Sequence, residues 1–262
     1  MTNRAIVVGK YYHRNFILTG LPRSGTTLLC DMIDQLENVV CLNESLYQTE
    51  SLPGDFCAVR NLLMANRPIP CRIYWDNIVK DELGKSITTG GERRLVDKPI
   101  KPDVLIGSKV CSPYLVRLNY LIQNGWPLFA IVRHPSYTIG SWNRPQNKSL
   151  NVSRIPNDVQ FSQFPFKHTE KYKCQCEVWQ ALTNKIIHYQ KFFTAIVRYE
   201  DLTNDPNNIM GIIAKLLGAD SKPDYEPLKN YNDKDRYPDF DKINEAVSEL
   251  CPAMKHFGYE PI

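Results

Sequence analysis

The chain has 262 residues, 43% of them hydrophobic and 23% charged, which fits a single globular domain over residues 1–262. Its formal net charge is only +4 and no dense run of Lys and Arg occurs, which argues against a nucleic-acid partner. The apolar stretch Ala5–Val8 is too short for a signal-peptide core, and no run of about 18 apolar residues argues for a membrane span. We therefore expect a cytoplasmic protein or a domain taken from a longer chain.

The first predicted element is a strand at Phe16–Leu18, a short apolar run that comes directly before a glycine-containing loop. The loop reads Gly20-Leu-Pro-Arg-Ser-Gly-Thr-Thr-Leu-Leu29, and apolar residues at helical spacing predict a helix from Thr26 to about Leu36. A strand, a tight loop and a helix in this order form a phosphate cradle. The amides of Ser24–Thr27 then point at one anion, aided by the positive end of the helix dipole.

The loop has the length of a Walker A motif, but Thr26 follows Gly25 directly, at the place where that motif has its lysine. The loop therefore lacks the group that reaches the β- and γ-phosphates of ATP. We expect it to hold a nucleotide with a single phosphate at the 5′ end instead. The residues predicted to bind this end are Arg23, Ser24, Gly25, Thr26 and Thr27.

The rest of the chain alternates strand-like and helix-like segments, which predicts an α/β fold: a P-loop-type, mostly parallel central sheet flanked by helices. Apolar runs predict further strands at 39–42, 105–110, 128–132 and 194–197. Helical spacing predicts helices at about 112–125, from 135 onward, and at about 170–192, 206–217 and 241–257. Residues 50–100 contain Pro53, Pro68, Pro70 and Gly90-Gly91, and residues 145–168 show no regular pattern either, so we expect irregular segments that form an acceptor pocket or lid.

A second anion site is predicted after the most apolar strand. Arg133 follows residues 128–132 directly, and Ser141 comes eight residues later on the next predicted helix. An arginine can contact a phosphate with two parallel hydrogen bonds, and the serine hydroxyl can add a third. Ligands of open parallel sheets lie beyond the carboxyl ends of the strands, so both sites can hold one molecule. A nucleotide phosphorylated at both ends of its ribose satisfies both.

These residues resemble the sulfotransferases that use 3′-phosphoadenosine 5′-phosphosulfate (PAPS). Pro22-Arg-Ser-Gly-Thr-Thr27 is similar to the 5′-phosphosulfate loop of that family, and Arg133 with Ser141 is similar to its 3′-phosphate site in type and spacing. Val197-Arg-Tyr-Glu-Asp-Leu202 and the ending His256-Phe-Gly-Tyr-Glu260 also resemble family segments. The resemblance runs from about residue 16 to 260 and omits 50–100 and 145–168. The loop type is that of the branch that includes bacterial and protein-tyrosine sulfotransferases.

The resemblance implies roles for individual residues. Glu44, which lies 21 residues after Arg23, matches a glutamate that deprotonates the acceptor. Lys109, which lies 24 residues before Arg133, matches a lysine that steadies the transferring sulfuryl group. Arg23 would contact the 5′-phosphosulfate, and Tyr199 would lie near the adenine. The implied reaction moves a sulfuryl group from PAPS to a hydroxyl or amine and releases adenosine 3′,5′-bisphosphate, without a metal.

The acceptor is predicted less sharply. The segments 50–100 and 145–168 contain aromatic residues and acids, a mixture that favours a small polar molecule over an acidic polysaccharide. A peptide tyrosine or a glycan remains an alternative acceptor. A P-loop kinase with a degenerate loop and a nucleotide-binding scaffold without turnover remain alternative functions. His168 is held as a reserve base. Asp97-Lys98-Pro99 also resembles a lysine–proline turn of the family, but its distance to Arg133 fits less well than that of Lys109. The oligomeric state is not assigned.

The cysteines predict neither a metal site nor a disulfide framework. They form no Cys-x-x-Cys pair, and Cys174 and Cys176 form a lone Cys-x-Cys without a second pair to complete a zinc site. We expect reduced and mostly buried thiols. The eight positions are 30, 41, 57, 71, 111, 174, 176 and 251.

Overall fold

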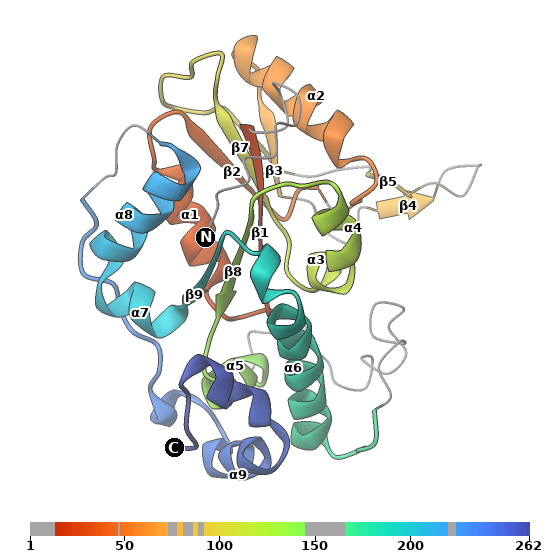
Figure 1. Ribbon diagram of the computed structural model, residues 1–262, viewed down its shortest axis with the longest axis vertical. Coiled ribbons are helices and arrows are strands. Elements are labelled where there is room, and N and C mark those ends of the chain that lie inside the picture. The colour runs from red at the N-terminus through yellow and green to blue at the C-terminus, as the bar shows by residue number, and fades with distance from the viewer. Residues whose placement is uncertain are drawn as a thin grey trace.

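A parallel sheet of five strands forms the centre of the molecule, in the order β2-β7-β1-β8-β9 (Figure 1). The computed structural model describes residues 14–46, 48–72, 78–80, 86–88, 92–144, 166–219 and 224–262. The strands are β1 Asn15–Gly20, β2 Val39–Asn43, β7 Leu105–Lys109, β8 Leu128–Val132 and β9 Ala195–Arg198. The predicted α/β class with a parallel sheet is confirmed.

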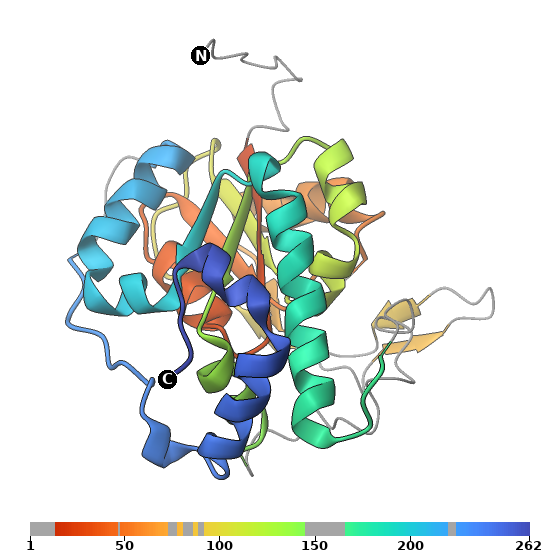
Figure 2. The ribbon, with the colours of Figure 1, turned by 60° about the horizontal axis from the view of Figure 1, so that its bottom comes forward.

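Helices cover both faces of this sheet. In Figures 1 and 2, α7 and α8 lie on one side of the strands and α6 lies on the other. The helices are α1 Thr26–Asp34, α2 Leu52–Met64, α3 Ser112–Val116, α4 Leu118–Gln123, α5 Pro135–Trp142, α6 Lys171–His188, α7 Tyr199–Asn204, α8 Pro206–Leu217 and α9 Phe240–Leu250. Two antiparallel pairs stand apart from the sheet, β3 Ile69–Arg72 with β6 Glu92–Arg94 and β4 Ile78–Lys80 with β5 Ser86–Thr88.

Alternating side chains of the strands supply two hydrophobic cores, one on each face. In β8, Phe129 and Ile131 join the core beneath α1 and α8, whereas Leu128, Ala130 and Val132 join the core beneath α6 and α9. Because successive side chains of a strand point to opposite faces, a strand buried on both faces is apolar throughout. That is why the central strands were the clearest elements in the sequence.

The segment predicted to be irregular at 50–100 contains a helix instead. Leu52, Phe56, Val59 and Leu63 recur at helical spacing along α2 and are all buried. Pro53 lies in the first turn of α2, where its missing N–H costs no hydrogen bond. The prediction was wrong here because the proline marks a helix start rather than a break.

Two predicted helices are divided in the structure. The helix expected at 112–125 changes direction at Arg117, which separates α3 from α4. The helix expected at 241–257 ends at Leu250, because Pro252 cannot continue the α-helical ladder and begins a 3₁₀ helix, Pro252–Phe257. The sequence did not predict α7, a single short stretch that begins directly after β9.

Seven cysteines are free thiols, and all of them but Cys57 are buried: Cys30, Cys41, Cys57, Cys111, Cys174, Cys176 and Cys251. In the part of the chain that the structure describes, no helix is long and apolar enough to cross a membrane.

Gly107 of β7 allows a close contact at the centre of the sheet. A Cβ atom at this position would lie 2.1 Å from the ring of Phe16, which packs edge-to-face on Phe129. We predict that Gly107→Ala lowers the free energy of unfolding by about 1–3 kcal/mol, because the aromatic pair must shift. Gly54→Ala is the control: nothing lies within 4 Å of its Cβ position on α2, so stability should stay the same or rise by up to about 1 kcal/mol. Urea denaturation measures both, and equal effects would contradict the packing explanation.

Candidate active site

Every strand of the central sheet ends at a predicted site residue, directly before one, or at the start of the phosphate loop. Lys109 is the last residue of β7 and lies opposite Leu18 of β1 and Asn43 of β2, so Glu44 follows at its side. Gly20, which begins the phosphate loop, lies opposite Ile131, two residues before Arg133. The parallel register therefore brings the predicted residues to the carboxyl ends of the strands, where open α/β sheets bind ligands.

The phosphate loop has the conformation of an anion cradle. Arg23 and Gly25 adopt left-handed backbone angles, with φ of 68° and 93°. Gly25 is the N-cap of α1 and offers no side chain, so the amides of Thr26 and Thr27 in the first helical turn have no intrahelical acceptor. Left-handed angles on both sides of Ser24 let the loop aim backbone donors at one point.

Ser24 contributes differently from what the sequence suggested. Its amide donates to the carbonyl of Leu21 at 3.1 Å within the turn, so this amide does not face a ligand. Its hydroxyl is fully buried and has no hydrogen-bond partner within the described residues. A buried hydroxyl without a partner carries an energetic cost that a bound oxyanion removes.

The ammonium that the loop lacks comes from another strand. The Thr26 side chain is buried, and its hydroxyl lies 3.3 Å from the Cys111 sulfur instead of facing outward. The Nζ atom of Lys109, by contrast, donates to the Thr27 hydroxyl at 3.2 Å. Lys109 thus delivers a positive charge to the start of α1 from β7.

Lys109 and Glu44 form a partly buried ion pair. The Lys109 side chain is 1% exposed and its Nζ lies 2.9 Å from Oε1 of Glu44, whose side chain is 29% exposed. Nζ also donates to Oδ1 of Asn43 at 3.0 Å, so three acceptors hold the ammonium in place. Glu44 has a left-handed φ of 53°, unusual for a residue with a long side chain, and its amide donates to the Lys109 carbonyl.

This pair keeps Lys109 charged despite its burial. Burial lowers the pKa of Lys109, but Cys111 in its thiolate form, the charge of Glu44 and the Glu44 hydrogen bond raise that pKa by more, so the net shift is upward. Burial raises the pKa of Cys111, which makes it a neutral thiol at neutral pH. Glu44 is therefore the partner that carries the compensating charge.

Arg133 is buried and donates four hydrogen bonds. Its Nε donates to Oδ1 of Asn232 at 2.8 Å and its Nη1 to the Arg23 carbonyl at 3.1 Å. Its Nη2 donates to the Tyr231 carbonyl at 3.0 Å and the Tyr237 hydroxyl at 3.1 Å. The second anion site is thus tied to the phosphate loop and also to the segment 231–237, which the sequence did not single out.

Tyr199 lies between the two anion sites. The Arg133 guanidinium sits 4.5 Å from the centre of its ring, and a Cβ atom on Gly25 would lie 2.6 Å from the ring edge. Its hydroxyl accepts the amide of Tyr231 at 3.2 Å. Because Tyr199 is 3% exposed, it presents no open face in this structure for stacking on adenine, and its contacts are those of a support for Arg133.

Positive charge accumulates where the two sites meet. Nε of Arg23 donates to the Ser141 hydroxyl at 3.3 Å and the Arg23 carbonyl accepts from Arg133, so these three residues lie together. Partial loss of water and the nearby charges of Arg133 and Arg144 lower the pKa of Arg23, although its side chain still reaches solvent. Within the described residues, no carboxylate forms an ion pair with Arg23 or Arg133.

Some residues of this region were missed by sequence reasoning. Trp142 is buried and its indole N–H donates to the Pro22 carbonyl at 2.8 Å, which anchors the start of the phosphate loop. Arg144 follows two residues later, and Asn232 lies about a hundred positions from its partner Arg133. Trp142 could have been found from the sequence because it directly follows Ser141, a predicted ligand, whereas no sequence pattern indicates the contact of Asn232 with Arg133.

Other candidates lie elsewhere. Lys98 donates to the carbonyls of Asp34, Leu36 and Val39, the contact with Leu36 at 3.0 Å. It therefore stabilises the turn between the end of α1 and the start of β2. His168 pairs through Nδ1 with Glu177 at 2.9 Å near the start of α6. Most of the aromatic and acidic residues predicted to shape the acceptor pocket lie outside the described residues, namely Tyr74, Trp75, Asp76, Asp81, Phe161 and Phe164.

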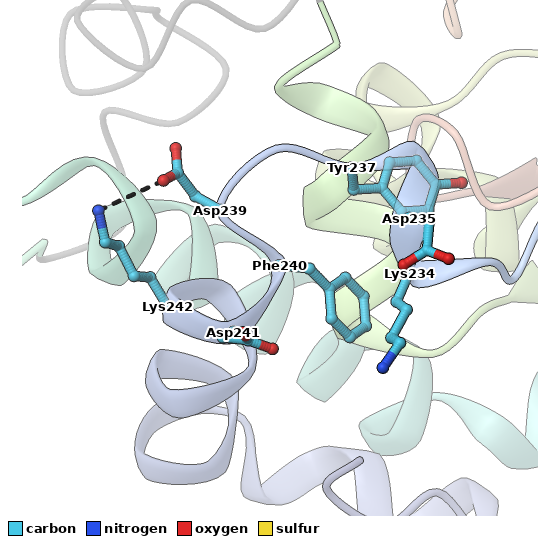
Figure 3. A pocket seen from close by; sticks show the side chains of 7 residues that line it. All are labelled: Lys234, Asp235, Tyr237, Asp239, Phe240, Asp241 and Lys242. Carbon is cyan, nitrogen blue, oxygen red and sulfur yellow. Dashed lines mark hydrogen bonds and ion pairs between the residues drawn. The ribbon is translucent and has the colours of Figure 1, made fainter.

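An open pocket of about 390 Å³ lies beside the Arg133 end of the site (Figure 3). Its lining residues are Lys234, Asp235, Tyr237, Asp239, Phe240, Asp241 and Lys242. Tyr237 connects it to Arg133, which follows β8, whereas Glu44 follows β2 at the opposite edge of the sheet. The pocket is therefore not placed to hold an acceptor against Glu44.

Among the described residues, no group of three or more His, Cys, Asp or Glu side chains gathers as metal ligands do.

Comparison with known proteins gives matches of structure alone. No family model matches the chain, and no curated protein matches it in sequence. A sulfotransferase from Alicyclobacillus acidocaldarius is 14% identical, with 93% of this chain and 94% of that chain covered and a TM-score of 0.49. The sulfotransferase domain of the Synechococcus PCC 7002 olefin synthase is 15% identical, with coverages of 94% and 95% and a TM-score of 0.46.

A mouse sulfotransferase complexed with PAP is 13% identical, with 91% of this chain and 83% of that chain covered and a TM-score of 0.42. Identities this low and TM-scores below 0.5 carry no functional assignment, which therefore depends on the residues themselves.

His134 gives a pH test of the site's surroundings. Its Nδ1 accepts the Ser136 amide and its Nε2 donates to the Glu260 carbonyl, which requires a neutral ring. Burial lowers the pKa of His134, and the charges of Arg133 and Arg198 add to this, although the Glu260 carbonyl and Glu200 oppose it. A lowered pKa contributes stability that is complete above the unfolded value of about 6.5 and is lost as pH falls through the folded value.

We therefore predict that wild-type stability falls between pH 7.5 and pH 5.5, and that His134→Asn removes part of this fall. Asparagine can still cap α5, so the variant should fold. His188→Asn, at an exposed position, should keep the wild-type pH dependence. Urea denaturation at the two pH values measures this difference. An unchanged pH dependence in His134→Asn would show that His134 is not the titrating group.

Proposed function

We propose that this protein is a PAPS-dependent sulfotransferase that moves a sulfuryl group to a hydroxyl or amine of a small acceptor and releases adenosine 3′,5′-bisphosphate. One observation carries the proposal. Two positively charged sites for anions, the phosphate loop and the Arg133–Ser141 pair, lie side by side and are joined through Arg23. A nucleotide with phosphates at both ends of its ribose is the ligand whose charges match this arrangement.

The residues fit such a ligand. The unpartnered Ser24 hydroxyl and the uncapped start of α1 offer donors to the 5′ end. Among the described residues, no carboxylate pairs with Arg23 or Arg133, which suits the binding of a multiply charged anion. Lys109 stands where a P-loop kinase would need its lysine, but it is held by Glu44 and Asn43 and approaches from β7. This arrangement favours sulfuryl transfer over the kinase alternative.

In the proposed reaction, PAPS supplies a sulfuryl group activated by its bond to the 5′-phosphate. Glu44 accepts the proton of the acceptor's hydroxyl or amine as the new bond to sulfur forms. The electron pair of the breaking sulfur–oxygen bond goes to the 5′-phosphate oxygen, where Lys109, Arg23 and the amides of α1 stabilise the developing charge. Lys109 also holds Oε1 of Glu44, so one ammonium orients the base and faces the phosphate loop.

The acceptor class follows from composition. The segments 50–100 and 145–168 contain aromatic and acidic side chains without an excess of basic ones, which suits a small polar acceptor, including a cationic one, better than a sulfated or acidic polymer. A labelled-donor screen across small metabolites, glycans and peptides identifies the class directly, and transfer only to acidic polysaccharides would contradict this part of the proposal.

The cofactor assignment predicts that Arg133→Ala weakens binding of adenosine 3′,5′-bisphosphate by about 10- to 100-fold, because charged hydrogen bonds to the 3′-phosphate are lost. Binding of adenosine 5′-monophosphate, which lacks that phosphate, should change by less than twofold. Arg117→Ala, which removes an exposed partner of Glu50, is the control and should bind both nucleotides normally. Calorimetry measures all three proteins, and wild type that binds no bisphosphate would refute the assignment.

The base assignment predicts that Glu44→Gln lowers kcat by about 10²- to 10⁴-fold with the best acceptor from the screen. The amide cannot take the proton, but it can still accept the hydrogen bond of Lys109. Bisphosphate affinity should therefore stay within twofold of wild type. Glu50→Gln, at an exposed acid, should leave kcat unchanged. Glu44 would be removed from the mechanism by intact turnover in a folded Glu44→Gln protein.

A further inference from the structure

We propose that Asn232 and Glu200 are positioning residues that orient Arg133 for the 3′-phosphate, and so let the protein distinguish a 3′,5′-bisphosphate from a nucleotide with a 5′-phosphate alone. This inference rests on the proposed function. Neither residue belongs to the two anion sites, and each acts through a hydrogen bond to the next residue.

The contacts form a continuous chain. Oε1 of Glu200 accepts the side-chain amide of Asn232 at 2.8 Å, and Oδ1 of Asn232 accepts Nε–H of Arg133, also at 2.8 Å. Glu200 is itself fixed at both oxygens. Its Oε1 also accepts the backbone amide of His134 at 3.1 Å, and its Oε2 accepts the Tyr259 hydroxyl at 2.6 Å.

The direction of each hydrogen bond makes asparagine the residue that fits. The side chain must donate to a carboxylate on one side and accept from a guanidinium on the other, which an amide does and a carboxylate does not. An aspartate at this position would place two negative groups together, and an aliphatic residue would leave Nε–H of Arg133 without an acceptor. The amide of Asn232 therefore transmits the fixed position of Glu200 to Arg133.

The site needs this support because a guanidinium binds phosphate through a planar fork. Two parallel hydrogen bonds require the plane of the arginine to be set before the anion arrives. The Nε contact with Asn232 fixes rotation at one edge of the plane, and the ring of Tyr199 lies 4.5 Å from the central carbon. With the Nε edge held, Nη1 is turned toward Arg23 and the phosphate loop, whereas Nη2 donates to the Tyr231 carbonyl and the Tyr237 hydroxyl.

The experiment measures the affinities of adenosine 3′,5′-bisphosphate and adenosine 5′-monophosphate by calorimetry. The proteins compared are wild type, Asn232→Ala, Arg133→Ala and the double variant Arg133→Ala/Asn232→Ala. Asn232 is only partly buried, so the single variant should fold normally. We expect it to bind the bisphosphate about 5- to 20-fold more weakly while monophosphate binding changes by less than twofold. The double variant should bind the bisphosphate no more weakly than Arg133→Ala, because Asn232 acts through Arg133.

Glu200 is tested by a pair of substitutions. Glu200→Ala should show the same selective loss of bisphosphate affinity as Asn232→Ala. Glu200→Gln should bind the bisphosphate nearly as wild type does, because the glutamine oxygen can accept from Asn232 and His134 while its amide faces the Tyr259 hydroxyl. Asp201→Asn, the same chemical change at the exposed neighbouring acid, is the control and should bind both nucleotides as wild type does.

The outcomes separate this inference from the proposed function. If wild type distinguishes the two nucleotides and Asn232→Ala distinguishes them equally well, the positioning role is wrong and the proposed function stands. A similar loss for both nucleotides would indicate a general structural role and would also overturn the inference. If wild type itself does not prefer the bisphosphate, both the inference and the proposed function fail.

Discussion

The pairing of β1 with its two neighbours is the constraint on which the site depends. Leu18 lies opposite Lys109 of β7, and Gly20 lies opposite Ile131 of β8. These two registers place the phosphate loop between a buried ammonium and a buried guanidinium that come from distant parts of the chain. A shift of one residue in either pairing would turn the side chains of the strand to the other face and separate the charges from the loop.

The site collects cations and compensates only part of their charge. Lys109 has Glu44 as a partner, whereas Arg23 and Arg133 hydrogen-bond to neutral oxygens, and Arg133 lies close enough to disfavour the charge of Arg23. Burying positive groups in this way costs folding stability unless an anion neutralises them. On the function proposed here, the nucleotide supplies that negative charge, so binding and stability should rise together.

The strands, the phosphate loop and Arg133 were predictable because their signals are local, whereas Glu44 and Lys109 were named only through the family resemblance. An apolar run followed by a glycine loop or by an arginine can be recognised from the sequence alone. The parallel sheet then places Arg23, Lys109 and Arg133 at the carboxyl ends of its strands. The missed features depend on contacts between distant segments. The contact of Asn232 with Arg133 spans 99 positions and has no periodicity to reveal it, and α2 was missed because its proline was interpreted as a break.

The central claim is that one nucleotide occupies both anion sites, and a crystal structure with adenosine 3′,5′-bisphosphate tests it most directly. The account predicts the 5′-phosphate on the amides at the start of α1 and near the Ser24 hydroxyl, with Lys109 close by. It predicts the 3′-phosphate within hydrogen-bond distance of Arg133 and Ser141. A bisphosphate bound elsewhere, or bound with its 3′-phosphate turned away from Arg133, would contradict the account.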